Sequence, residues 1–153
     1  MIAVIQRVSQ ASVKVEGEKI AKIDKGLLIL LGIFTDDTEL GCQFLSDKIA
    51  NFRIFSDYFS KMNLSLKDIG GEALGVSQFT LCGDWLKGRR PSFIHAASPD
   101  HGEKLYNVFI DNLDSKGIPT KTGKFGAMME VSLINDGPVT FVLDSKLKTE
   151  YQL

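Results

Sequence analysis

Apolar and polar residues alternate at the start of the chain, as they do in strands that bury one face. The alternation runs through 2–8 and again through 11–15, and it predicts two strands. At 27–34 nearly every residue is apolar, which is typical of a central strand buried on both faces. Further strands are predicted at 53–55 and at 73–81.

Two other segments repeat apolar residues at helical spacing. In the first, Asp36 and Glu39 resemble a capping box, and apolar residues follow at positions 40, 44, 45, 49 and 52. In the second, Ser98 suits the N-cap, Pro99 suits the first helical position and Gly117 ends the helix. The buried stripe of this second helix is expected at 105, 108, 109 and 113.

The last third predicts a hairpin, in which strands at 127–134 and 139–143 flank a turn at 135–137. Some seven strands and two main helices predict an α+β fold with a largely antiparallel sheet. No repeat or linker interrupts the sequence, so we expect a single domain over residues 1–153.

Composition narrows the class of protein. The chain has 44% hydrophobic and 24% charged residues, which is ordinary for a soluble domain. No apolar run approaches the roughly 18 residues of a membrane helix, and the start lacks the pattern of a signal peptide. Cys42 and Cys82 lie far apart and outside any CxxC motif, so neither a disulfide nor a zinc site is predicted. These features predict a cytoplasmic protein.

The net charge of −1 argues against a protein that coats long stretches of duplex. Positive charge is local, chiefly at Lys87, Arg89 and Arg90, and also at Lys121 and Lys124. Such patches could contact a few phosphates at the end of a nucleic acid. The alternative for the segment 89–93 is a solvated loop.

Two short motifs carry the remaining chemistry. The motif 77–81 ends an apolar run with two hydroxyls and an amide, and the motif 135–140 places Gly137 before Pro138, a dipeptide that can adopt a cis bond. Neither motif contains a cysteine, a histidine or a pair of carboxylates. A site made from them would depend on main-chain groups and on the substrate.

Each candidate residue also has a simpler interpretation. Thr80 has no visible base to activate it, and it could be an ordinary strand residue. Gly137 and Pro138 could form a mere turn. Neither histidine is oriented by its sequence context as a catalytic base, and His101, in the first turn of a helix, is expected at the solvated surface.

Taken together, the motifs closely resemble those of the D-aminoacyl-tRNA deacylase family over nearly the whole chain. The resemblance is carried, in the family's order, by 5–8, 77–81, 90–93, 97–99 and 135–140. It implies a barrel-like sheet and a homodimeric enzyme with its sites at the interface. The enzyme would hydrolyse the ester between a D-amino acid and the terminal ribose of tRNA, with glycyl-tRNA as a second substrate. No cofactor and no metal are implied, although the sequence leaves metal dependence open, and nothing is implied for the tail at 144–153.

The resemblance also assigns roles to residues. Ser77, Gln78, Phe79 and Thr80 would form the catalytic motif, in which main-chain N–H groups stabilise the oxyanion. The nucleophile would be either Thr80 or a water assisted by the neighbouring ribose hydroxyl of the tRNA, and the absence of a base favours the water.

The second motif would provide chiral selection. Gly137 and Pro138, joined by a cis bond, would reach into the partner's site and exclude L side chains. Arg7 would hold this dipeptide, Met129 would support the pocket wall, and Arg89 and Arg90 are expected tRNA contacts. Two rival hypotheses are a non-catalytic nucleic-acid module of the kind that binds DNA replication origins, and a paralogous tRNA-editing enzyme with a trans Gly-Pro bond and relaxed chirality.

Overall fold

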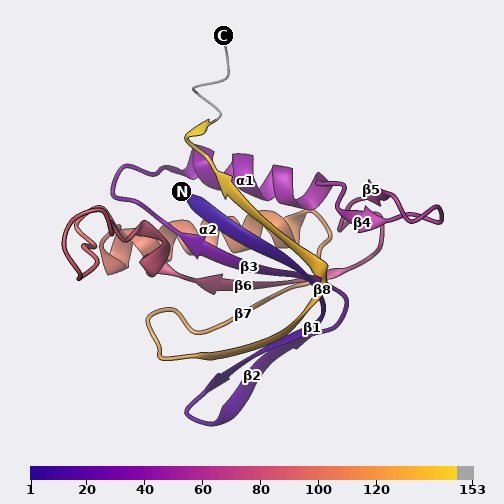
Figure 1. The fold of residues 1–153 in the computed structure, drawn as a ribbon, viewed down its shortest axis with the longest axis horizontal. Coiled ribbons are helices and arrows are strands. Elements are labelled where there is room, and N and C mark those ends of the chain that lie inside the picture. Colours follow the sequence, from indigo (N-terminus) through magenta and orange to yellow (C-terminus); the bar gives the residue numbers. More distant parts are fainter. Residues whose placement is uncertain (148–153) are drawn as a thin grey trace.

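One mixed sheet with two helices packed on it makes up most of the protein (Figure 1). The computed structural model describes residues 1–147. Its strands are β1 Ile2–Val15, β2 Glu18–Ile23, β3 Gly26–Gly32, β4 Phe55–Ser56, β5 Met62–Leu64, β6 Glu72–Ser77, β7 Thr120–Thr122 and β8 Glu130–Asp144. The helices are α1 Glu39–Asn51, the 3₁₀ turn η1 Phe79–Cys82 and α2 Pro99–Ser115.

The large sheet has the order β2-β1-β3-β6-β7, and β8 lies along the other edge of β1. Strand β1 pairs antiparallel with β2, β3 and β8, whereas β3–β6 and β6–β7 are parallel. The sheet curls until β7 approaches β2, where Lys121 Nζ donates to the carbonyl of Lys22 at 2.7 Å. It is therefore nearly closed into a barrel, and the predicted α+β class is confirmed.

Strand β3 shows why the sheet has two cores. Leu27, Ile29 and Leu31 face α1 and α2, while Leu28 faces the interior of the curled sheet. All four are buried, as expected for a strand that is apolar at nearly every position. The remaining large apolar residues of the helix-facing core include Leu45, Ile49, Leu105, Phe109 and Leu113.

The prediction of a C-terminal hairpin is wrong. Residues 130–144 form one strand, β8, both halves of which pair with β1. Between the pairs Gln6–Thr140 and Val8–Asn135, the four residues 136–139 of β8 stand opposite Arg7 alone. They bulge out of the ladder as a loop, the 136–139 loop. The residues predicted to turn do leave the ladder, but their two flanks pair with β1 and not with each other. The local sequence does not specify this pairing.

Other boundaries differ for related reasons. Strand β1 is continuous over the predicted gap at 9–10, because β8 pairs with it on both sides of that gap. The strand predicted at 73–81 ends at Ser77, and the one predicted at 53–55 is the short β4. The first helix begins at Glu39 after Thr38, with no side-chain cap, while Asp36 forms an ion pair with Lys146 at 3.3 Å. Leu40, the first apolar residue of the predicted helical repeat, is 75% exposed.

The second helix follows its prediction. The hydroxyl of Ser98 accepts from the N–H of His101, Pro99 opens α2, and Gly117 adopts a left-handed φ of 81° just beyond its end. No helix among residues 1–147 is long and apolar enough to cross a membrane. Of the tail at 144–153, Ser145 donates its N–H to the carbonyl of Met1, while 148–153 lie outside the described residues.

Candidate functional site

The motif 77–80 stands where β6 ends. Ser77 pairs with Leu31 of β3, and the N–H of Gln78 still bonds to the Leu31 carbonyl at 2.8 Å. The carbonyl of Gln78 then accepts from the N–H of Leu81 at 3.2 Å, so the chain turns into η1. The sheet therefore holds the motif at one end of its central strands.

The side chain of Thr80 is exposed, and its hydroxyl accepts from Nε2 of Gln78 at 2.5 Å. Within residues 1–147 no carboxylate, imidazole or amine bonds to this hydroxyl. The N–H groups of Phe79 and Thr80 have no acceptor in the same part of the chain, since the first N–H groups of a helical turn lack a preceding carbonyl. Two such donors can stabilise a carbonyl oxygen that gains negative charge.

Aromatic packing supports this turn. The ring of Phe79, itself exposed, meets the ring of Phe93 edge to face, with centroids 5.0 Å apart. A Cβ added to Gly83 would come within 3.0 Å of the Phe93 ring, so this glycine lets the ring approach. The supporting role of Phe93 was not predicted, although Phe93 lies within the quoted motif 90–93.

Arg89 and Arg90 lie in an exposed loop that leaves η1. The loop is closed by reciprocal backbone bonds between Asp84 and Ser92, at 2.8 and 2.9 Å. Gly88 turns it with a φ of 70°. No ion pair in the described part of the chain involves either arginine. Both side chains are thus exposed on the loop that follows η1.

The 136–139 loop is held from within by its flanking residues. The side chain of Asn135 accepts from the N–H of Val139 at 3.1 Å and donates to the hydroxyl of Thr140 at 3.0 Å. The peptide bond between Gly137 and Pro138 is cis, and Gly137 has a φ of 134°, which favours glycine. Asn135 and Thr140 were quoted as motif residues, but no role was predicted for either.

Arg7 of β1 supports the 136–139 loop through its guanidinium group. Its Nε donates to the carbonyl of Asp136 at 3.1 Å and lies 3.3 Å from the Asp136 carboxylate. Its Nη1 donates to the carbonyl of Ile54 at 2.8 Å. A Cβ added to Gly137 would lie 3.2 Å from Nη2 of Arg7. The structure thus brings Arg7 against the Gly137–Pro138 dipeptide.

The two motifs do not meet within the chain. Ser77 lies in the same row of the sheet as Leu31 and Ala3, whereas the 136–139 loop begins directly after Asn135, which pairs with Val8. From Ala3 to Val8 is five residues, or about 17 Å along the strand. Figure 1 shows the loop where β8 bends, at the opposite end of the sheet from the segment that follows β6.

Met129 lies toward the Ser77 end. It packs against the inner core of the curled sheet, and its sulfur would be 2.6 Å from a Cβ on Gly123. The N–H of Gly123 bonds to the carbonyl of Gly75, two residues before Ser77. The position of Met129 is thus beside β6.

Behind β6, Tyr106 of α2 donates its hydroxyl to the same Gly75 carbonyl at 2.7 Å. Burial raises the pKa of Tyr106 to about 12. This support was not predicted, because Tyr106 lies outside the expected helical stripe.

The two histidines lie apart from the candidate site motifs in sequence. His101, expected at the solvated surface, is instead half-buried, with Nε2 at 3.0 Å from the carbonyl of Asp37. His95 is exposed, and its carbonyl accepts from the N–H of Thr35.

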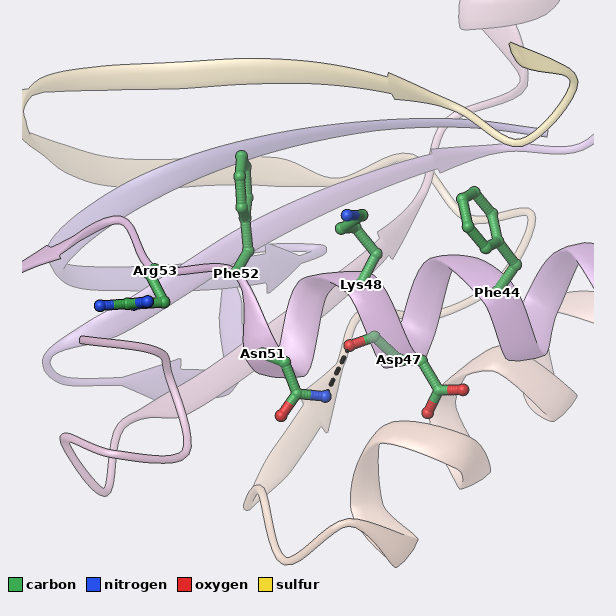
Figure 2. A pocket seen from close by; sticks show the side chains of 6 residues that line it. All are labelled: Phe44, Asp47, Lys48, Asn51, Phe52 and Arg53. Carbon is green, nitrogen blue, oxygen red and sulfur yellow. Dashed lines mark hydrogen bonds between the residues drawn. The ribbon is translucent and has the colours of Figure 1, made fainter. Parts of the chain in front are cut away.

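A separate groove runs beside α1 and contains none of the predicted site residues. Figure 2 shows its lining, in which Asn51 donates to the main-chain carbonyl of Asp47 at 2.9 Å. The lining residues are Phe44, Asp47, Lys48, Asn51, Phe52 and Arg53. Among residues 1–147, no three His, Cys, Asp or Glu side chains are grouped so that they could hold a metal ion.

Comparison with known proteins assigns the chain to a family. A family model described as D-Tyr-tRNA(Tyr) deacylase matches residues 4–144. The chain belongs to this family. Both motifs of the candidate site fall within the matched residues.

Individual relatives of the D-Tyr-tRNA(Tyr) deacylase family agree over nearly their whole lengths. A D-aminoacyl-tRNA deacylase of Thermodesulfovibrio yellowstonii is 58% identical, over 95% of this chain and 100% of its own. One from Thermotoga petrophila is 55% identical, over 95% and 97%.

Solved structures show the same fold. A c-Myc DNA unwinding element binding protein aligns with a TM-score of 0.89 and 44% identity, over 94% of this chain and 98% of its own. A probable eukaryotic D-amino acid tRNA deacylase aligns with a TM-score of 0.82 at 17% identity, over 93% and 97%. The second likeness concerns the fold alone.

Proposed function

We propose that the protein hydrolyses the ester bond of D-aminoacyl-tRNA in a homodimer, with each site built from both subunits. One observation carries the shared site: the 77–80 motif and the 136–139 loop lie at opposite ends of the same sheet. A two-fold dimer that places one end of each subunit against the opposite end of its partner would bring them together twice.

The chemistry would use main-chain donors. A water molecule attacks the ester carbonyl, and the N–H groups of Phe79 and Thr80 stabilise the oxyanion that forms. The ester C–O bond then breaks, and the ribose oxygen leaves with a proton. The neighbouring ribose hydroxyl of the tRNA assists the water, since among residues 1–147 no carboxylate, imidazole or amine bonds to the Thr80 hydroxyl.

Selectivity would come from exclusion. Carbonyl groups of the Gly137–Pro138 dipeptide accept hydrogen bonds from the amino group of the substrate, and the rigid dipeptide leaves no room for an L side chain. A D side chain points away into open space, so many D-amino acids fit. Glycine has no side chain to exclude, and glycyl-tRNA is a second substrate.

The tRNA would enter along the exposed loop that carries Arg89 and Arg90. Guanidinium groups match phosphate oxygens in geometry, and a few such contacts suffice to hold an acceptor end. The net charge of −1 agrees with a local contact of this kind.

The test is deacylation of matched D-tyrosyl-, L-tyrosyl- and glycyl-tRNA by the purified protein. We expect multiple turnovers with the D and glycyl substrates and none with the L substrate. Absence of D-tyrosyl-tRNA turnover would refute the activity, and turnover of L-tyrosyl-tRNA would support an editing enzyme of relaxed chirality.

A non-catalytic nucleic-acid module is the second candidate, because a protein named for binding a DNA unwinding element shares the fold at 44% identity. It predicts duplex binding that weakens steeply with salt, without hydrolysis. The same preparation can be tested for both properties.

A further inference from the structure

Two groups of exposed apolar side chains lie outside the candidate site. Tyr58 and Phe59, which we call the β4–β5 tip, are 96% and 78% exposed. Trp85 and Leu86, which we call the 85–86 loop, are 77% and 75% exposed. Large apolar residues grouped in this way on a protein surface mark an interaction site.

The β4–β5 tip is well ordered by its own hydrogen bonds. The carboxylate of Asp57 accepts from the N–H groups of Phe59 at 2.8 Å and Lys61 at 3.0 Å. The bond from Lys61 is the main reason why the pKa of Asp57 is lowered. The rings of Tyr58 and Phe59 meet edge to face with centroids 5.6 Å apart. The bonds to Asp57 therefore constrain the backbone of the tip, which presents both rings at the surface.

The 85–86 loop is constrained in a similar way. The N–H of Leu86 bonds to the carboxylate of Asp84 at 3.0 Å. Asp84 in turn forms the two backbone bonds to Ser92 that close the loop. Its exposed apolar residues are therefore held on a closed loop.

The two groups lie at opposite ends of the subunit. Arg7 links the 136–139 loop to the carbonyl of Ile54, the residue before β4, so the tip belongs to the end that carries Gly137 and Pro138. The 85–86 loop follows η1 and belongs to the end that carries Ser77–Thr80. In Figure 1, β4 and β5 extend away from one end of the sheet, and the loops after β6 lie at the other.

We propose that the β4–β5 tip of one subunit packs against the 85–86 loop of its partner beside the shared site. This inference rests on the proposed function, because the shared site joins the same two ends. The occupant of each apolar group is thus a second copy of this chain, and two-fold symmetry forms the contact twice. The contact buries four large side chains that are exposed in a single subunit, and it anchors the Gly137–Pro138 dipeptide in the neighbouring site.

A double-mutant cycle on the dimer tests the contact. We expect Tyr58→Ser/Phe59→Ser and Trp85→Ser/Leu86→Ser each to raise the dimer dissociation constant at least about tenfold in sedimentation. The combined variant should have a dimer dissociation constant little higher than that of either pair alone, because both pairs remove the same contact. The control, Ile20→Ser/Leu40→Ser, removes two other exposed apolar residues and should leave the constant unchanged.

Cross-linking gives an independent readout. Phe59→Cys combined with Trp85→Cys should form a disulfide between subunits on oxidation, whereas Leu40→Cys combined with Trp85→Cys should not. The native Cys42 and Cys82 are buried, so they are poor competitors. Unchanged dissociation in both serine pairs, together with no cross-link, would overturn the contact.

The outcomes separate this inference from the proposed function. A wild-type protein that is monomeric while it hydrolyses D-tyrosyl-tRNA would refute the shared site itself. In another outcome, Tyr58→Ser/Phe59→Ser leaves the dimer dissociation constant unchanged but raises KM for D-tyrosyl-tRNA and not for D-tyrosyl-adenosine. This outcome would show that the tip contacts RNA. That result would also overturn the inference.

Discussion

Arg7 connects two segments that are distant in sequence. Its guanidinium group bonds to the carbonyls of both Asp136 and Ile54, and a planar group with several donors is needed to reach both. Lysine carries a single point of positive charge. The substitution Arg7→Lys therefore tests how far the geometry of the 136–139 loop determines activity.

We expect Arg7→Lys to lower kcat/KM for D-tyrosyl-tRNA by at least about tenfold and to lower the free energy of unfolding by about 1 kcal/mol. Steady-state kinetics and urea denaturation measure the two effects. The control is Arg53→Lys, because Arg53 Nε donates to the carbonyl of Asn63 at 2.9 Å, away from the loop. Equal effects of both substitutions on kcat/KM would show that the loop does not depend on Arg7.

Thr80→Ala tests the nucleophile. We expect kcat to stay within a few-fold of the wild type, since the main-chain N–H groups and the ribose hydroxyl are unchanged. Removal of the neighbouring ribose hydroxyl from the tRNA should reduce kcat far more. Single-turnover rates on the two substrates decide the question. An inactive Thr80→Ala protein that leaves normal turnover of the deoxy substrate in the wild type would make Thr80 the nucleophile.

For single residues, the sequence predicted the absence of a partner better than it predicted supporting contacts. The motif itself offers no base for Thr80, and within residues 1–147 only Gln78 bonds to its hydroxyl. The contacts of Phe93 and Tyr106 depend on segments that fold back from elsewhere in the chain. No local pattern specifies them.

At the scale of elements, α2 both covers the sheet and supports β6 through Tyr106. Burial raises the pKa of this phenol from 10.0 to about 12, so the folded protein keeps its proton where the unfolded chain loses it. The stability that the buried phenol contributes is therefore complete below pH 10 and decreases as the pH rises toward 12.

We expect Tyr106→Phe to lower the free energy of unfolding at pH 7 by about 0.5–1.5 kcal/mol, through loss of the bond to Gly75. Above pH 10 the variant should lose stability less steeply than the wild type. Cys42, whose pKa burial raises to about 11, contributes equally to both proteins. Denaturation at several pH values measures the slopes. Tyr58→Phe, which changes an exposed tyrosine, should match the wild type, and identical slopes in all three proteins would contradict the assignment.

The contrast between α2 and β8 shows which elements a sequence can specify. The signals of α2 at Ser98, Pro99 and Gly117 act over one helical turn, and the structure follows them. The signals at 135–138 also act locally and predict a turn. In the folded protein they make a loop within β8, because β1 is long enough to pair with both flanks.

At the scale of the whole molecule, the family and the fold class could be predicted from the motifs and their order. The separation of those motifs could not, because it depends on the registers that β3 makes with β1 and β6. The proposed shared site predicts a specific behaviour of mixed dimers. Two inactive variants, each damaged in a different motif, should restore activity when their subunits exchange.

The suitable pair is Phe79→Pro, which removes one N–H of the proposed oxyanion site, and Gly137→Ala, whose Cβ would come within 2.6 Å of the Val139 side chain. After unfolding and refolding together, half of the dimers are mixed, and each has one intact site. We therefore expect about a quarter of wild-type activity, because both sites of a two-fold dimer are equivalent.

Separate refolding of each variant is the control and should give almost no activity. The measurement is initial rate on D-tyrosyl-tRNA at equal total protein. If the refolded mixture is no more active than the separate proteins, each site lies within one subunit.

The placement of the 136–139 loop within a paired strand has a consequence for how the protein could change over evolution. On either side of the loop, β8 keeps its own register with β1: Thr140 to Asp144 opposite Gln6 to Ile2, and Glu130 to Ile134 opposite Lys14 to Gln10. An inserted or deleted residue in an ordinary strand turns every following side chain to the wrong face. Here the loop would absorb it, and both flanks would keep their faces. The segment proposed to set substrate choice is thus the part of β8 whose length is freest to vary.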